Sequence, residues 1–105
     1  ILVTLLYAKY MNRKAENKHH NITVTGRVQG VGFRASTQRK ARELGIKGFV
    51  RNEPDGSVYI EAEGPQENIN EFLDWLEHGP RFARVDKVQK EEGTAKNYEN
   101  FQIHR

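Results

Sequence analysis

The stretch best suited to chemistry is Gly26-Arg-Val-Gln-Gly-Val-Gly-Phe-Arg34, which lies between a predicted strand and a predicted helix. Its close-set glycines, Gly30 and Gly32, let the backbone curl tightly, so that successive N–H groups point toward one place. The free N–H groups at the start of the helix add positive potential there. Arg34 falls in the first helical turn, where its guanidinium can contact two oxygens of one anion. The pattern predicts a site for a phosphate-sized dianion; the alternative is a plain tight turn with Arg34 as a solvated charge.

Periodic patterns predict the elements that position this stretch. Apolar and polar residues alternate over 22–28 and 57–63, which is typical of half-buried strands, and 46–51 is predicted to form another strand between them. Helical spacing of apolar residues predicts one helix from Phe33 to Leu44, followed by Gly45 as its C-terminal glycine. A second helix is predicted between Gly64-Pro65, with proline at the first helical position, and Gly79-Pro80.

The rest of the chain completes a recognisable order of elements. A fourth strand is predicted around Val85 and Val88, then a polar loop from Glu91 to Asn97, then an edge strand containing Tyr98, Phe101 and Ile103. The order βαββαβ predicts an α+β fold of the ferredoxin-like split βαβ class. In it, an antiparallel sheet is covered on one face by two helices. Because this fold hosts many functions, it does not identify one.

Length and composition restrict the class of protein. The 105 residues suffice for one domain, which we place at 21–105, with residues 1–20 as an N-terminal extension. Within the extension we expect an apolar upstream segment over 1–10 and a mobile polar tail from Lys9 to His20. The net charge of +3 resides in the extension, which leaves the domain formally neutral and argues against a nucleic-acid partner. The apolar start is far shorter than the roughly 20 residues that span a bilayer, so no membrane partner is expected.

The chain contains no cysteine. This excludes a disulfide scaffold and phosphatase chemistry that uses a cysteine nucleophile. We therefore expect a cytoplasmic protein, and a neutral, compact body of this size leads us to expect a monomer.

Two motifs resemble the signatures of the acylphosphatase family. The stretch from Gly26 to Arg34 is similar to the first signature, and Gly48-Phe-Val-Arg-Asn52, followed by Pro54-Asp-Gly-Ser-Val58, is similar to the second. The resemblance covers essentially all of 21–105. It implies an acylphosphatase that hydrolyses the carboxyl–phosphate bond of small acyl phosphates, such as acetyl or carbamoyl phosphate. The family uses no cofactor and no metal.

The resemblance also implies a role for each site residue. Arg34 would bind the substrate phosphate, and Asn52 would orient the attacking water. The backbone cradle would come from the loop residues Gln29, Gly30, Val31, Gly32 and Phe33. Such a site suits phosphoryl transfer, which needs positioning and charge stabilisation. The leaving carboxylate has a conjugate acid with a pKa of about 4.3, so it departs without a general acid. By composition alone, Asn52 is better explained as a turn residue of a hairpin, and it is the resemblance to the family pattern that favours the catalytic role.

Other candidate residues have simpler explanations. His19 and His20 are interpreted as a solvated pair in the tail rather than as metal ligands. Glu61 and Glu63 share one face of a strand, and an exposed polar face explains them better than a catalytic acid pair. A hydroxyl early in a helix, as in Ser36, more often bonds its own backbone than a substrate.

Two rival functions remain open at this point. The first is a non-catalytic phosphate- or acyl-phosphate-binding module of the same fold, either a sensor or a domain of a larger carbamoyl-phosphate-using maturation protein. We expect that the end of the chain just after the last strand favours a free-standing enzyme. The second rival is binding of single-stranded RNA, which requires aromatic side chains on the central strands. Tyr59 is the one aromatic residue predicted on their polar face.

Overall fold

The computed structural model describes residues 2–7 and 17–105. Residues 2–7 form a short helical segment whose apolar side chains are exposed. In the described part of the chain, no helix is both long and apolar enough to cross a membrane. The predicted mobile tail lies outside the described residues as far as position 16.

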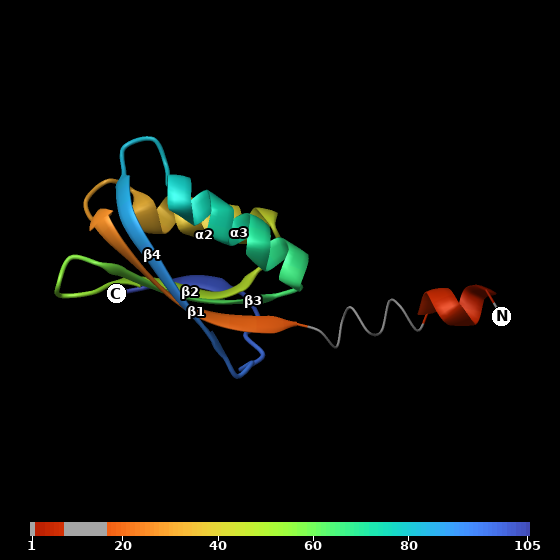
Figure 1. Cartoon of the computed structure of the whole chain (residues 1–105). Helices are drawn as coiled ribbons and strands as arrows, with labels where there is room; N and C mark the ends of the chain where they lie inside the picture. The colour runs from red at the N-terminus through yellow and green to blue at the C-terminus, as the bar shows by residue number, and fades with distance from the viewer. Residues whose placement is uncertain (1, 8–16) are drawn as a thin grey trace.

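The elements follow the predicted order. They are β1 (Lys18–Arg27), α2 (Phe33–Glu43), β2 (Lys47–Asn52), β3 (Val58–Gly64), α3 (Gln66–His78), β4 (Arg84–Gly93) and β5 (Phe101–His104). Figure 1 shows α2 and α3 lying side by side over one face of the sheet. The ferredoxin-like α+β fold is thereby confirmed.

The strand order places three strand ends together. The sheet has the order β4-β1-β3-β2-β5. Both β1 and β2 pair antiparallel with β3, so they run in the same direction, and β5 pairs parallel with β2. The edge strand therefore departs from the predicted antiparallel sheet. As a result, the carboxyl ends of β1, β2 and β5 lie together along the same edge of the sheet, the one that the strand ends form. Figure 1 shows the C-terminus there, beside the β2–β3 turn.

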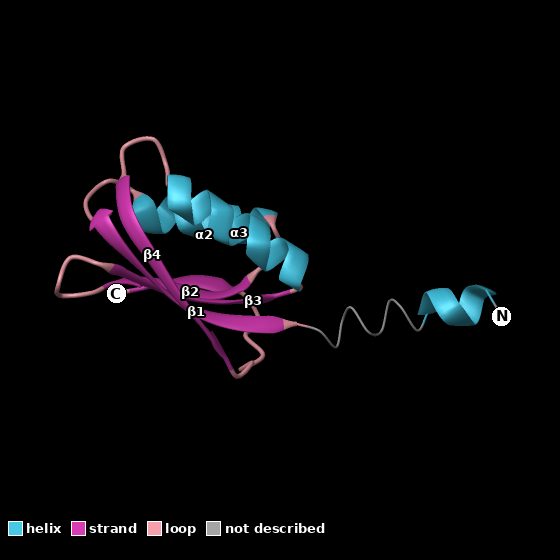
Figure 2. Ribbon diagram, in the orientation of Figure 1, coloured by secondary structure: helices cyan, strands magenta, loops and turns pink. Residues whose placement is uncertain are grey.

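The core fills the space between the sheet and the two helices, and the other sheet face carries no helix (Figure 2). Val58, Ile60 and Ala62 of β3 all point into this core and are fully buried, as the alternation of β3 predicts. The apolar stripe of α3 packs against them. Its members are Ile69, Phe72, Leu73 and Leu76.

Several boundaries differ from the sequence predictions. Strand β1 begins at Lys18 because its pairing with β3 continues as far as Gly64, so His19 and His20 are buried rather than solvated. Strand β4 continues to Gly93, into the predicted loop, because it pairs with the same extension of β1. Pro65 is the N-cap of α3, one position before the predicted place.

The sequence prediction for Glu61 and Glu63 is wrong. Both carboxylates lie on the sheet face that carries no helix, yet they are only 6% and 5% exposed. The β4–β5 loop covers them: the backbone N–H of Tyr98 donates to Glu63 Oε1 at 3.0 Å, and its hydroxyl donates to Glu61 Oε1 at 2.8 Å. We call His19, Glu61, Glu63 and Tyr98 the open-face cluster.

Candidate active site

The β1–α2 loop has the backbone conformation that its glycines predict. Gly30 and Gly32 have φ angles of +74° and +76°, in the left-handed region that L residues rarely adopt. A Cβ atom built on either glycine would meet nothing within 4 Å. Glycine is therefore required at both positions by the positive φ angle of the backbone and not by contact with neighbouring atoms. The space beside the loop is open at these two points.

The N-terminus of α2 is prepared for an anion. Gly32 is its N-cap, no side chain caps it, and its first turn contains no acidic residue. The first N–H groups of a helix have no partner within the helix, so here they remain available to a ligand. Arg34 is the second residue of α2 and adds a full positive charge at the same point.

Gln29 ties this loop to the β2–β3 hairpin. Its Nε2 atom donates to the backbone oxygens of Glu53 and Ser57, each at 2.8 Å. The turn itself is closed by Asp55, whose Oδ1 atom accepts bonds from the backbone N–H and the hydroxyl of Ser57. The side chain of Gln29 thus holds the two parts of the site in a fixed relation.

Asn52 is the last residue of β2 and reaches the same edge of the sheet. Its Oδ1 atom is buried and has no hydrogen-bond partner among residues 17–105. Leaving a buried polar atom unpaired costs about 1–3 kcal/mol. The atom is therefore suited to accept a hydrogen bond from a bound water or ligand.

The β1–α2 loop, the start of α2 and the ends of β2 and β5 line a pocket of about 660 Å³ that is open to solvent, which we call the edge pocket. It is lined by Val28, Gly30, Gly32, Phe33, Arg34, Ala35, Asn52, Ile103 and Arg105. The structure thus brings Arg34 and Asn52 together with three of the predicted cradle residues. It does not place Gln29 or Val31 on the lining, since Val31 packs against the core. Sequence reasoning missed Ile103 and Arg105, which only the parallel pairing of β5 with β2 brings here.

The hydroxyls that follow Arg34 do not line the edge pocket. Thr37 is fully buried in α2, and the Ser36 hydroxyl accepts a 3.4 Å bond from Arg39. Neither is placed to touch a ligand bound at the helix start.

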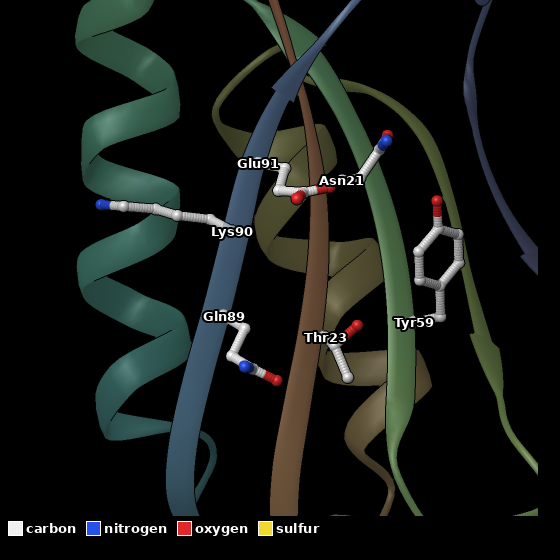
Figure 3. A pocket seen from close by; sticks show the side chains of 6 residues that line it. All are labelled: Asn21, Thr23, Tyr59, Gln89, Lys90 and Glu91. Carbon is white, nitrogen blue, oxygen red and sulfur yellow. The ribbon is translucent and has the colours of Figure 1, made fainter.

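A second hollow, of about 540 Å³, lies against β1, β3 and β4. Figure 3 shows Thr23, Gln89 and Tyr59 around it, while Lys90 points away from the other labelled side chains. Its other charged lining residue is Glu91, so it does not offer an anion the positive surroundings found at the edge pocket.

The sheet face without helices holds more aromatic rings than the sequence predicted. Phe49 lies beside Tyr59 and Tyr98, with ring centroids 5.9 and 6.0 Å apart, and His104 stacks on it at 4.4 Å. Phe49 is only 6% exposed. These rings pack on one another, an arrangement unlike the displayed aromatic platform that stacks RNA bases.

Comparison with known proteins gives a consistent result. The family model described as acylphosphatase matches residues 20–103. An acylphosphatase of Archaeoglobus fulgidus is 50% identical over 82 residues, which cover 78% of this chain and 92% of that protein. The solved acylphosphatase of Coxiella burnetii superimposes with a TM-score of 0.84 at 36% identity, covering 88% of this chain and 97% of its own.

A similar fold also forms a small part of a larger protein. Full-length HypF, solved in a phosphate- and nucleotide-bound form, matches with a TM-score of 0.77 and 30% identity. The match covers 85% of this chain but only 12% of HypF. The relative from Archaeoglobus has the higher identity, and the match covers nearly all of that protein rather than a small part of it.

Proposed function

The chain belongs to the acylphosphatase family, and we propose that Arg34, the amides of the β1–α2 loop and Asn52 carry out its reaction in the edge pocket. The protein is an enzyme that hydrolyses acyl phosphates to a carboxylate and inorganic phosphate. The predicted activity is thus confirmed, and the rival non-catalytic module is not the function that these relatives support.

Substrate binding begins with the phosphate group. Its oxygens accept hydrogen bonds from the free N–H groups of the β1–α2 loop and the first turn of α2. The guanidinium of Arg34 contacts two of these oxygens at once. Because these donors are fixed by the fold before substrate arrives, they stabilise charge on the phosphoryl oxygens without reorganising during the reaction.

Asn52 positions the nucleophile. Its Oδ1 atom accepts a hydrogen bond from a water molecule, which directs a lone pair of the water oxygen toward phosphorus. The neutral amide suits this role, since a carboxylate at the same place would repel the phosphate. The observation that carries this assignment is that Asn52 lines the pocket that also contains Arg34, while its buried Oδ1 atom has no hydrogen-bond partner among residues 17–105.

The chemical step balances without an added acid. The water oxygen forms a bond to phosphorus while the bond from phosphorus to the acyl oxygen breaks, and the electron pair leaves on the carboxylate. One water proton stays on the new phosphate oxygen, and the other passes to a phosphate oxygen or to bulk water. The carboxylate is a weak base, so it leaves unprotonated.

Hydrolysis of benzoyl phosphate, followed by ultraviolet absorbance in buffer with EDTA, tests the proposal. We expect Arg34→Gln to raise KM and to lower kcat/KM by at least about a hundredfold. Arg39→Gln is the matched control, because Arg39 is exposed on the same helix and does not line the edge pocket. Equal activity of the two variants would overturn the role of Arg34.

We also propose that the enzyme acts as a monomer in the cytoplasm. The small size and formal neutrality of the domain over 21–105 support a monomer. Sedimentation velocity measured alongside activity tests the oligomeric state, and an activity found only in a dimer fraction would contradict it.

A further inference from the structure

Arg105 lies beside Asn52 at the end of the β2–β5 pair. The parallel register pairs Val50 with Ile103 and Arg51 with His104, so that Asn52 and Arg105 follow as the next neighbours. Side chains alternate along a strand, and Val50 is buried in the core under the helices. Asn52 and Arg105, each two residues further on, therefore return to the helix-covered side, where both line the edge pocket.

In the part of the chain that the structure describes, Arg105 also has no acidic side chain paired with it. Within residues 17–105, neither Arg34 nor Arg105 forms an ion pair, and the lining of the edge pocket contains no carboxylate side chain. Two other arginines near strand ends are paired: Arg51 with Glu53 at 2.6 Å and Arg84 with Asp86 at 3.1 Å. The edge pocket is thus lined by two arginine side chains and by no carboxylate side chain, which suits an anion such as phosphate.

We propose that Arg105 is a second phosphate-binding cation of the edge pocket, a role that rests on the proposed function of Arg34 and Asn52. Arg34 and the loop amides hold the phosphate from the side of α2, and Arg105 binds its oxygens from the side of β5. Its position next to Asn52 places its charge near the attacking water as well. The same contacts hold the inorganic phosphate that the reaction releases, so Arg105 strengthens inhibition by product.

Inhibition by inorganic phosphate tests this role. A hydrogen bond to a charged group contributes enough to change affinity about tenfold. We therefore expect Arg105→Gln to raise the inhibition constant of phosphate about tenfold and to lower kcat/KM for benzoyl phosphate by a similar factor. Arg105→Lys should fall between this variant and the wild type, because lysine keeps the charge but not the planar fork. The control Arg39→Gln should match the wild type, and an unchanged inhibition constant in Arg105→Gln would overturn the proposal.

A titration of the wild-type protein gives a readout that does not depend on a variant or on turnover. Nuclear magnetic resonance of the arginine Nε–Hε groups is recorded while inorganic phosphate is added. We expect the signals of Arg34 and Arg105 to move along one binding curve, while that of Arg39 stays in place. Movement of Arg34 alone would overturn the role of Arg105 and leave the proposed function intact. Movement of neither would overturn both.

Discussion

The Nδ1 atom of His19 lies 2.6 Å from Oε2 of Glu63, across the pairing of β1 with β3. Its other ring nitrogen, Nε2, lies 3.0 Å from Glu61 Oε1 and 2.9 Å from Asn21 Oδ1. Both ring nitrogens of His19 therefore lie within hydrogen-bond distance of side-chain oxygen atoms. The open-face cluster thus joins one histidine to two carboxylates, and through Tyr98 it fastens the β4–β5 loop to the sheet.

Replacing His19 should destabilise the fold without affecting the active site. His19→Gln removes the imidazole that contacts both buried carboxylates, and leaving a buried charged group without its hydrogen-bond partner costs about 3 kcal/mol. We expect the free energy of unfolding, measured with urea, to fall by about 3 kcal/mol. Because His19 lies near the start of β1 and the edge pocket lies beyond its end, kcat/KM of the folded variant should stay at the wild-type value. His78→Gln, at an exposed helix end, is the control and should change stability by less than about 0.5 kcal/mol.

Acid should weaken the fold through the same cluster. Burial by itself opposes ionisation of Glu63, but the N–H groups of Lys96 and Tyr98, together with His19, outweigh it and lower the pKa of Glu63 below its ordinary 4.5. A carboxyl group with a lowered pKa in the folded state adds stability above its unfolded pKa, and that stability is lost as the pH falls through the folded value. We expect the urea midpoint to drop as the pH falls below about 4.5.

The variant Glu63→Gln isolates this contribution. It should be less stable at pH 7 and should show a flatter dependence on pH below about 5, since the carboxyl group that titrates has gone. Glu71→Gln, on the exposed face of α3, should keep the wild-type profile. Parallel acid profiles for Glu63→Gln and the wild type would contradict the assignment.

Asn52→Ala should separate binding from turnover. Loss of the Oδ1 acceptor removes an interaction that matters on the way to the transition state, so kcat should fall about a hundredfold while KM changes little. Asn52→Asp should lower kcat as well and also raise KM, because its carboxylate repels the phosphate. Steady-state hydrolysis of benzoyl phosphate measures both constants. Near-normal turnover of Asn52→Ala would show that another group positions the water.

Gly32 and Gly45 form a matched pair for testing the cradle. Both have positive φ angles, of 76° and 67°, and both leave open space where a Cβ atom would stand. Alanine at either position should therefore cost a similar amount of stability, about 1–2 kcal/mol. Only Gly32 lines the edge pocket, so only Gly32→Ala should also reduce kcat/KM, by at least about tenfold. Equal activities of the two variants would show that the loop conformation does not hold the phosphate.

The residues differ in how far the sequence could predict them. The position of Arg34 at the candidate site was predictable because the features that create it are its neighbours in the sequence. These are two closely spaced glycines and the start of a helix. Arg105 was not, because its place depends on the parallel pairing of β5 with a strand that lies some 50 positions earlier in the chain. Strand alternation put Glu61 and Glu63 on one face, as the structure confirms, but alternation does not reveal what covers a face. Here the β4–β5 loop covers it, through bonds that no periodic pattern encodes.

The meeting of three strand ends at one edge also links catalysis to folding. Residues 29–34, Asn52 and Arg105 approach one another only after β1, β2 and β5 have joined the same sheet. An unfolded chain therefore offers phosphate no comparable site, and we expect phosphate to bind the native state selectively and to stabilise it by mass action. Since β5 follows the other described strands in the chain, an anion bound at this edge would also report that β1, β2 and β5 have been assembled.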